Sequence, residues 1–293
     1  MMQLVVDSKN VLGECALWCE RTDRLLWTDI ERAVLFAHTP ATGDTVSWDM
    51  PERLGSFALT ADDDRLLLGL ASGLAFFQLS TGAVTRICDV EPHLPGTRLN
   101  DGRCDRQGRF VFGTFNQVGN PRHPVGSFYR LNHDLTLDVL PLGPVAIANS
   151  ICFSPDGATM YFADSASQTI RCCAYDTVTG AVRNVRLFAD LRGRAGEPDG
   201  STIDADGHLW NASWGASAIV RFAPDGSVER VLALAASQPT CVAFGGPGLS
   251  TLYATSARTS LGDDELAARP GSGGVFAQQL DVRGLPEARF GAP

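Results

Sequence analysis

The stretch Asp23-Arg-Leu-Leu-Trp-Thr-Asp29 is the first of six copies of one pattern, in which a turn leads into a short apolar strand. The other five copies begin at Asp64, Gly108, Ala158, Gly207 and Ser250. Successive starts are 41, 44, 50, 49 and 43 residues apart. A period of about 40–50 residues is the length of one β-propeller blade. The repeats therefore predict six such blades.

Each repeat contains further strands around the quoted one. Glycine-containing turns that suit β-hairpins follow it in four repeats, at Ala41-Thr-Gly43, Ser80-Thr-Gly82, Val178-Thr-Gly180 and Pro224-Asp-Gly226. A short apolar strand also precedes it, as in Cys15–Trp18, and long helical periodicity is absent. We expect an all-β fold, a single six-bladed β-propeller domain over residues 1–293 with four antiparallel strands per blade. The ring would close by pairing of Gln3–Val6 with the last blade.

The composition indicates which classes of partner and which cellular compartment are compatible with the chain. The chain of 293 residues carries a formal net charge of −9, which disfavours nucleic acid and anionic membranes. It shows no signal-peptide pattern and no run near the ~20 apolar residues of a membrane span. The eight cysteines include no Cys-x-x-Cys pair and lie mostly in apolar runs, so we interpret them as small buried residues. We expect a cytoplasmic monomer.

Polar residues head several of the innermost strands. Stepping back eight or nine residues from each repeat start reaches Glu14, Gly55, Asn100, Asn149, Asp199 and Cys241. Four of these six carry oxygen ligands, and the strand heads converge at one mouth of a propeller channel. Buried carboxylates need a cation or hydrogen bonds, and this set suits Ca²⁺, Mg²⁺ or Mn²⁺, although Zn²⁺ and Fe²⁺ also accept it. The alternative is that these four are ordinary turn residues. The glutamate at position 14 makes this alternative weaker, because glutamate is uncommon in turns.

Other motifs for chemistry are missing. The sequence contains neither the Gly-x-Ser-x-Gly nucleophile elbow nor His-Glu-x-x-His. The stretch Thr202–Ser213 resembles a calcium loop but lacks the terminal carboxylate of an EF-hand, so we interpret it as a β-turn.

Segments spread over the whole chain resemble the sugar-lactonase family of gluconolactonases, regucalcin (senescence marker protein) and bacterial pentonolactonases. The matching segments are Leu12–Trp18, Trp27–Ile30, Arg98–Asp105, Gly113–Thr114, Asn149–Gly157, Pro198–Ser201 and Gly273–Phe276. The resemblance implies a six-bladed propeller with one divalent metal ion that hydrolyses aldonolactones such as glucono-, galactono-, arabinono- or xylonolactone. It implies Glu14, Asn149 and Asp199 as metal ligands, with Arg98 and Asn100 binding substrate.

Two departures from the family pattern stand out. Some members place a carboxylate after the Gly-Thr of the third blade, where it binds sugar hydroxyls. This chain has Phe115-Asn-Gln-Val-Gly119 there, so we expect Gln117, or else Asn116, to take that role. Cys15 stands where the family commonly has glycine.

The expected reaction and its alternatives follow from these residues. A divalent ion would polarise the lactone carbonyl and lower the pKa of water, and Asp199 is our candidate general base. A non-enzymatic calcium-binding regulator and an interaction scaffold are the alternatives. A regulator would bind metal without turning over lactones, and a scaffold would show no convergence of polar residues at the channel mouth.

Overall fold

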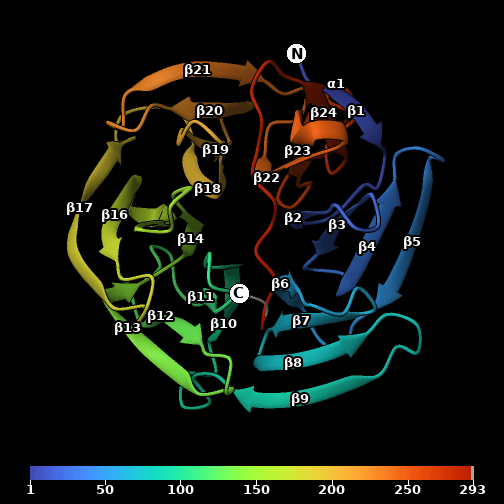
Figure 1. Cartoon of the computed structure of the whole chain (residues 1–293). Coiled ribbons are helices and arrows are strands. Elements are labelled where there is room, and N and C mark those ends of the chain that lie inside the picture. The colour runs from blue at the N-terminus through green and yellow to red at the C-terminus, as the bar shows by residue number, and fades with distance from the viewer. Residues whose placement is uncertain (292–293) are drawn as a thin grey trace.

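The computed structural model describes residues 1–291 as a ring of six four-stranded antiparallel sheets (Figure 1). This confirms the expected six-bladed propeller. Residues 292–293, at the end of the expected domain, lie outside the described residues.

Each of the first three blades runs outward from its first strand. Blade 1 consists of β2 (Gly13–Cys19), β3 (Arg24–Asp29), β4 (Val34–Thr39) and β5 (Asp44–Asp49). Blade 2 consists of β6 (Leu54–Leu59), β7 (Arg65–Leu70), β8 (Gly73–Gln78) and β9 (Val84–Asp89). Blade 3 consists of β10 (Thr97–Cys104), β11 (Phe110–Asn116), β12 (Gly126–Leu131) and β13 (Leu137–Val145).

The other three blades repeat this order. Blade 4 consists of β14 (Ala148–Phe153), β15 (Thr159–Asp164), β16 (Thr169–Tyr175) and β17 (Val182–Asp190). Blade 5 consists of β18 (Glu197–Ile203), β19 (Leu209–Trp214), β20 (Ala218–Phe222) and β21 (Val228–Ala233). Blade 6 consists of β22 (Pro239–Gly245), β23 (Thr251–Ser256), β24 (Val275–Gln279) and β1 (Gln3–Val6). The short helices are η1 (Ser165–Ser167), η2 (Pro247–Leu249) and α1 (Asp263–Ala268).

The N-terminal strand closes the ring, as the sequence predicts. β1 pairs antiparallel with β24 as the outermost strand of blade 6. The first strands of successive blades pack against one another around the axis. Blades 1 and 4, 2 and 5, and 3 and 6 therefore face each other across the channel.

Burial falls from the axis outward. Every residue of β6 is buried, whereas β5 at the rim is almost entirely exposed. The apolar side chains of neighbouring blades pack face to face, with Trp27, Trp210 and Phe57 at 0% exposure. Burial of apolar surface on both faces of the inner strands explains why the repeated stretch is so uniformly apolar.

Every innermost strand carries a register shift at its head. β18 has two residues, Asp199 and Gly200, between the paired positions Pro198 and Ser201. Similar irregularities occur in β2, β6, β10, β14 and β22. β-Bulges redirect side chains, and here they do so at the mouth of the channel.

The pairing register corrects one position taken from the repeat spacing. Pro239 pairs with Ser256 as Pro198 pairs with Ser213, so the blade 6 counterpart of Asp199 is Thr240, not Cys241. In blade 6, Thr240 lies one residue further from the repeat start at Ser250 than the eight or nine residues that separate these positions in the other blades.

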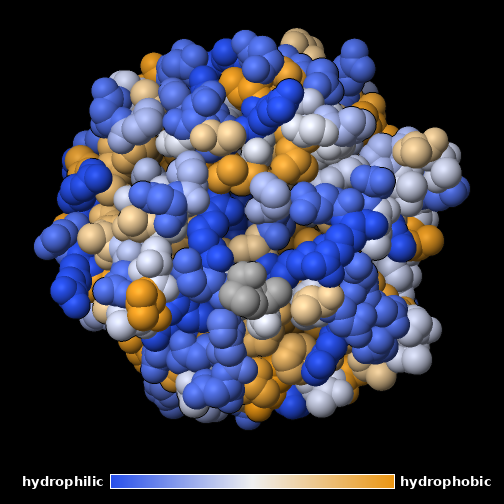
Figure 2. Space-filling view, in the orientation of Figure 1, coloured by the Kyte–Doolittle hydropathy of each residue, from blue (hydrophilic) through white to orange (hydrophobic). Residues whose placement is uncertain are grey.

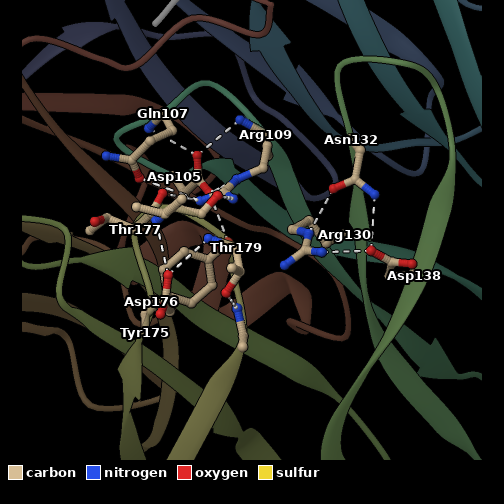
Figure 3. A network of polar contacts seen from close by, with 12 residues as sticks. Asp105, Gln107, Arg109, Arg130, Asn132, Asp138, Tyr175, Asp176, Thr177 and Thr179 are labelled. Carbon is tan, nitrogen blue, oxygen red and sulfur yellow. Dashed lines mark hydrogen bonds and ion pairs between the residues drawn. The ribbon is translucent and has the colours of Figure 1, made fainter.

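Polar contacts join blade 3 to blade 4 beside the core (Figure 3). The carboxylate of Asp105 accepts hydrogen bonds from the Arg109 guanidinium and from the Tyr175 hydroxyl of β16. Arg109 also donates to the backbone oxygens of Thr177 and Val178 in blade 4. These contacts fix the relative position of the two blades whose strand heads carry Asn100 and Asn149.

Residues 280–291 cross the middle of the ring after β24 (Figure 1). The segment pairs with blade 5 through the Asp204–Gly284 bridge and with blade 2 through the Thr60–Phe290 bridge. Both contacts lie at the trailing ends of innermost strands, so this segment covers the end of the channel opposite the strand heads.

Three further features of the structure concern its surface, its helices and its cysteines. Hydrophobic and hydrophilic side chains are interspersed on the face shown in Figure 2. None of the described helices has the length and apolar character needed to cross a membrane. All eight cysteines are free, and seven of them are buried.

Candidate active site

A cavity of about 390 Å³ opens at the strand heads, a size suited to a small ligand. Five of the residues expected from the sequence line it, namely Glu14, Arg98, Asn100, Asn149 and Asp199. The other lining residues are Leu12, Glu31, Phe115, Arg122, Ile147, Ser165, Glu197, Trp214, Gln238, Thr259 and Ser260.

Two aspartates hold the strand heads that carry Glu14 and Asn149. The carboxylate of Asp29, at the end of β3, accepts from the backbone N–H groups of Val11 and Leu12 at 2.8 and 3.1 Å. In blade 4, Asp164 accepts in the same way from the two residues before β14, at 2.9 and 3.0 Å. Each carboxylate satisfies two backbone donors and so fixes the approach of the chain to the site.

The residue after each of these positions has left-handed backbone geometry. Cys15 has φ 50° and Ser150 has φ 59°. Such a conformation costs a non-glycine residue about 1–2 kcal/mol. The left-handed conformation at Cys15 also gives a physical reason for glycine at this place.

Glu14 and Asp199 face each other with little compensating charge. Each carboxyl group is near enough to shift the pKa of the other. Burial, followed by the charge of Asp101, raises the pKa of Glu14 to about 8. Burial, followed by the charges of Glu14 and Asp101, raises the pKa of Asp199 well above its usual range. Two buried carboxylates so close need a proton or a cation between them.

The amide of Asn149 is oriented by its neighbours. Its Nδ2 donates to Ser165 Oγ at 2.8 Å, and that hydroxyl donates to the backbone oxygen of Pro198 at 2.7 Å. Asn149 Oδ1 accepts from Asn100 Nδ2 at 3.1 Å. With Nδ2 bound to Ser165, the amide oxygen keeps a second lone pair beyond the bond from Asn100.

Asn100 connects the amide of Asn149 to the guanidinium of Arg98. Its Oδ1 accepts from Arg98 Nη1 at 2.6 Å, and its Nδ2 also donates to the backbone oxygen of Ala148. Both ends of the Asn100 amide are therefore engaged within the protein.

Arg98 is deeply buried and only partly paired. It is 3% exposed, and its guanidinium lies 4.6 Å from the ring centroid of Phe115. Burial lowers its pKa to about 10, an effect that Glu31 and Glu14 oppose. Its Nε has no hydrogen-bond partner among the described residues. Nε has almost no accessible surface, so a ligand oxygen in the cavity would meet the guanidinium at Nη2, which makes no hydrogen bond among the described residues.

The structure does not bring Gln117 or Asn116 into the cavity lining. Gln117 is exposed, and its Oε1 accepts from Arg53 at 2.6 Å. Arg53 in turn pairs with Glu31 at 2.8 Å. Asn116 donates to the backbone oxygen of His123 and accepts from the N–H of Val118, so its amide shapes the loop after β11.

Arg122 extends from that same loop to the cavity. Its guanidinium lies 4.9 Å from the centroid of the Phe115 ring. The ring therefore carries two guanidinium groups, from Arg98 and Arg122, and such cation–π contacts hold both groups in place.

Several residues that hold the site were not predicted from the sequence. Ser150 Oγ and Asn211 Nδ2 both donate to the backbone oxygen of Asp199, at 2.6 and 2.9 Å. Thr240 Oγ1 donates to the backbone oxygen of Gly13, just before Glu14. Asn211 could have been found from the sequence, because it is polar at a position of the repeat that is apolar in the other five copies.

The chemistry of the donor set fits a hard divalent cation. Among residues 1–291, no group of three or more histidine, cysteine, aspartate or glutamate side chains is placed to hold a metal. The expected set instead combines the carboxylates of Glu14 and Asp199 with the amide oxygen of Asn149. Oxygen donors of this kind suit Ca²⁺, Mg²⁺ or Mn²⁺, and a cation would neutralise the facing carboxylates.

Comparison with known proteins identifies the family. The family model described as SMP-30/Gluconolactonase/LRE-like region matches residues 12–258, which include all five cavity-lining residues expected from the sequence. The chain belongs to this family. The resemblance drawn from the sequence motifs is thereby confirmed.

Several similar proteins align with almost the whole chain. The chain is 54% identical over 287 residues to a protein of Azospirillum brasilense named L-arabinolactonase, covering 98% of this chain and 94% of that one. It is 35% identical to a 6-deoxy-6-sulfogluconolactonase of Pseudomonas putida, covering 99% and 98%. A solved structure from Agrobacterium tumefaciens, described as the calcium-binding protein regucalcin, superposes with a TM-score of 0.94 at 32% identity, covering 99% and 97%.

Proposed function

We propose that the protein is a divalent-metal-dependent hydrolase that opens an aldonolactone to the corresponding sugar acid. The hydrolase class is supported by the relatives named L-arabinolactonase and 6-deoxy-6-sulfogluconolactonase. Because the first of these is 54% identical over nearly the full length, a pentonolactone such as L-arabinono-1,4-lactone is the substrate we favour.

Glu14, Asn149 and Asp199 would hold the metal. When bound, a divalent ion supplies polarisation of the lactone carbonyl, stabilisation of the developing oxyanion and a lower pKa for water. The facing carboxylates of Glu14 and Asp199 are the observation that carries this proposal, because their mutual repulsion in a buried cavity is relieved by a cation.

The protein side chains supply proton transfer and orientation. Asp199 is the proposed general base, which takes a proton from the attacking water. Its backbone oxygen is fixed by Ser150 and Asn211, so the carboxylate is presented from a rigid position. Arg98 would donate to sugar hydroxyls through its guanidinium, which Asn100 keeps in place. Such fixed placement lowers the entropic part of the barrier.

The domain organisation, cellular location and oligomeric state are also part of the proposal. We propose that residues 1–293 form one domain that acts as a cytoplasmic monomer. Sedimentation of the purified chain at micromolar concentration tests the monomer, and a dimer would contradict it.

The test is a pH-indicator assay with a panel of aldonolactones, run with and without chelator. We expect acid release that exceeds spontaneous hydrolysis, is abolished by chelation and returns with added Mn²⁺, Ca²⁺, Zn²⁺, Mg²⁺ or Fe²⁺ to different degrees. Full activity in a metal-free preparation would contradict the metal dependence. Metal binding without turnover of any lactone would instead support the regulatory alternative.

A further inference from the structure

Unsatisfied buried polar atoms single out two residues of the cavity. Among the described residues, nine buried side-chain nitrogen or oxygen atoms lack a hydrogen-bond partner. Only two of these belong to residues that line the cavity, namely Nε of Arg98 and Oε1 of Gln238. Oε1 itself has almost no accessible surface, so the amide nitrogen Nε2, which makes no hydrogen bond among the described residues, is the group of Gln238 that a ligand in the cavity can meet.

Gln238 and Arg98 stand on opposite sides of the ring. Gln238 immediately precedes β22 of blade 6, and Arg98 belongs to β10 of blade 3. These two strands face each other across the axis (Figure 1). A ligand that satisfies both residues must therefore lie across the channel mouth, over the carboxylates that blades 1 and 5 contribute.

The position of Gln238 is held by its main chain. Its backbone oxygen accepts from Ala257 N at 2.9 Å, and the side chain is 92% buried, since Gln238 is 8% exposed. Proline at position 239 restricts the backbone on the other side. The amide is thus presented from a rigid strand head, as a specificity contact requires.

The chemistry of a 1,4-lactone fits this span. In such a ring C-2 and C-3 carry hydroxyls on one side of the carbonyl carbon, and C-4 carries the exocyclic hydroxymethyl group on the other. If the ring hydroxyls lie toward Arg98 and the carbonyl over the carboxylates, the exocyclic hydroxyl points toward blade 6.

We infer that the amide of Gln238 binds the exocyclic hydroxyl of the lactone and selects substrates that carry it. This assignment rests on the proposed lactonase function. It gives Gln238 the role of a specificity residue whose amide nitrogen Nε2 donates to the hydroxyl oxygen.

The test is a comparison of two substrates in three proteins. L-Arabinono-1,4-lactone and its 5-deoxy analogue differ only in the exocyclic hydroxyl. We expect the wild-type protein to favour the hydroxylated lactone by about 10-fold or more in kcat/KM, the value of one well-placed hydrogen bond. Gln238→Met should reduce that preference to about 2-fold or less, by slowing only the hydroxylated substrate.

Gln278 provides a matched control. Its Oε1 is also buried without a partner, but it lies on β24 outside the cavity lining. Gln278→Met should keep the wild-type preference. Gln238→Asn, which retains the amide but withdraws it by one methylene, should lose the preference as Gln238→Met does, and it serves if the methionine variant does not fold.

The outcomes separate this inference from the proposed function. If the wild-type protein hydrolyses no lactone, the proposed function itself fails. If it hydrolyses both lactones equally well, or if Gln238→Met slows both to the same degree, the role of Gln238 is wrong while the lactonase function stands.

Discussion

One of the two hydrogen bonds that orient the Asn149 amide comes from a hydroxyl of a neighbouring turn, which Ser165→Ala removes. Ser165 Oγ accepts from Asn149 Nδ2 at 2.8 Å and donates to the backbone oxygen of Pro198 at 2.7 Å. Without it, Asn149 Nδ2 loses its acceptor, and the amide is less firmly held with its oxygen in place for a metal. One hydrogen bond contributes about 0.5–1.5 kcal/mol net. At 1.4 kcal/mol per factor of ten, the metal concentration for half-maximal turnover should rise about 2- to 10-fold.

The assay is lactone turnover by metal-stripped protein titrated with Mn²⁺. Since the Ser165 hydroxyl is bound by the Asn149 amide and by the backbone oxygen of Pro198, we expect it to act through the metal ligand, and kcat at saturating metal should stay within about 2-fold of wild type. Ser167→Ala is the matched control, because Ser167 lies in the same short helix but is exposed and bonds only within that turn, to Asp164 O and Thr169. An unchanged metal requirement together with a lower kcat in Ser165→Ala would refute this reasoning.

Three further predictions test other parts of the site. Arg98→Ala should lower kcat/KM by about 10-fold or more, which corresponds to roughly 1.4 kcal/mol of transition-state binding, and should change the metal requirement little. A variant that loses metal but keeps its KM would refute the role given to Arg98. Asp29→Ala should lose about 1–3 kcal/mol of unfolding free energy in urea titration, because two partly buried backbone N–H groups lose their acceptor. A loss below about 0.5 kcal/mol would count against the role of Asp29 in holding the strand head. Cys15→Gly should lose about 1–2 kcal/mol less of that free energy than Cys19→Gly, since relief at φ 50° offsets part of the lost packing and of the lost contact from the Phe57 N–H. Equal losses would refute the strain at Cys15.

The fold was predictable because one apolar pattern repeats at blade length. The same spacing located Glu14, Asn100, Asn149 and Asp199, since equivalent positions of a repeat occupy equivalent places around the axis. The spacing failed in blade 6, where one additional residue made Cys241 replace Thr240.

Contacts between blades could not be predicted in this way. The orientation of Asn149 depends on Ser165 and Pro198, which belong to a different part of the repeat and to the next blade. Gln117 was expected at the site from its place after β11, but Arg53 of blade 2 binds its amide outside the cavity. Such pairings arise from tertiary geometry, and no local pattern encodes them.

The central claim is that Asp199 both holds the metal and accepts a proton from water. Asp199→Asn keeps one coordinating oxygen and removes the basic one, whereas Asn149→Ala removes only a ligand. The decisive measurement is turnover of both variants as metal is titrated to saturation. We expect Asn149→Ala to recover partly with excess metal, and Asp199→Asn to remain about 10²- to 10⁴-fold below wild type in kcat with metal bound. Recovery of Asp199→Asn to near the wild-type rate at saturating metal would contradict the account and leave Asp199 as a ligand only.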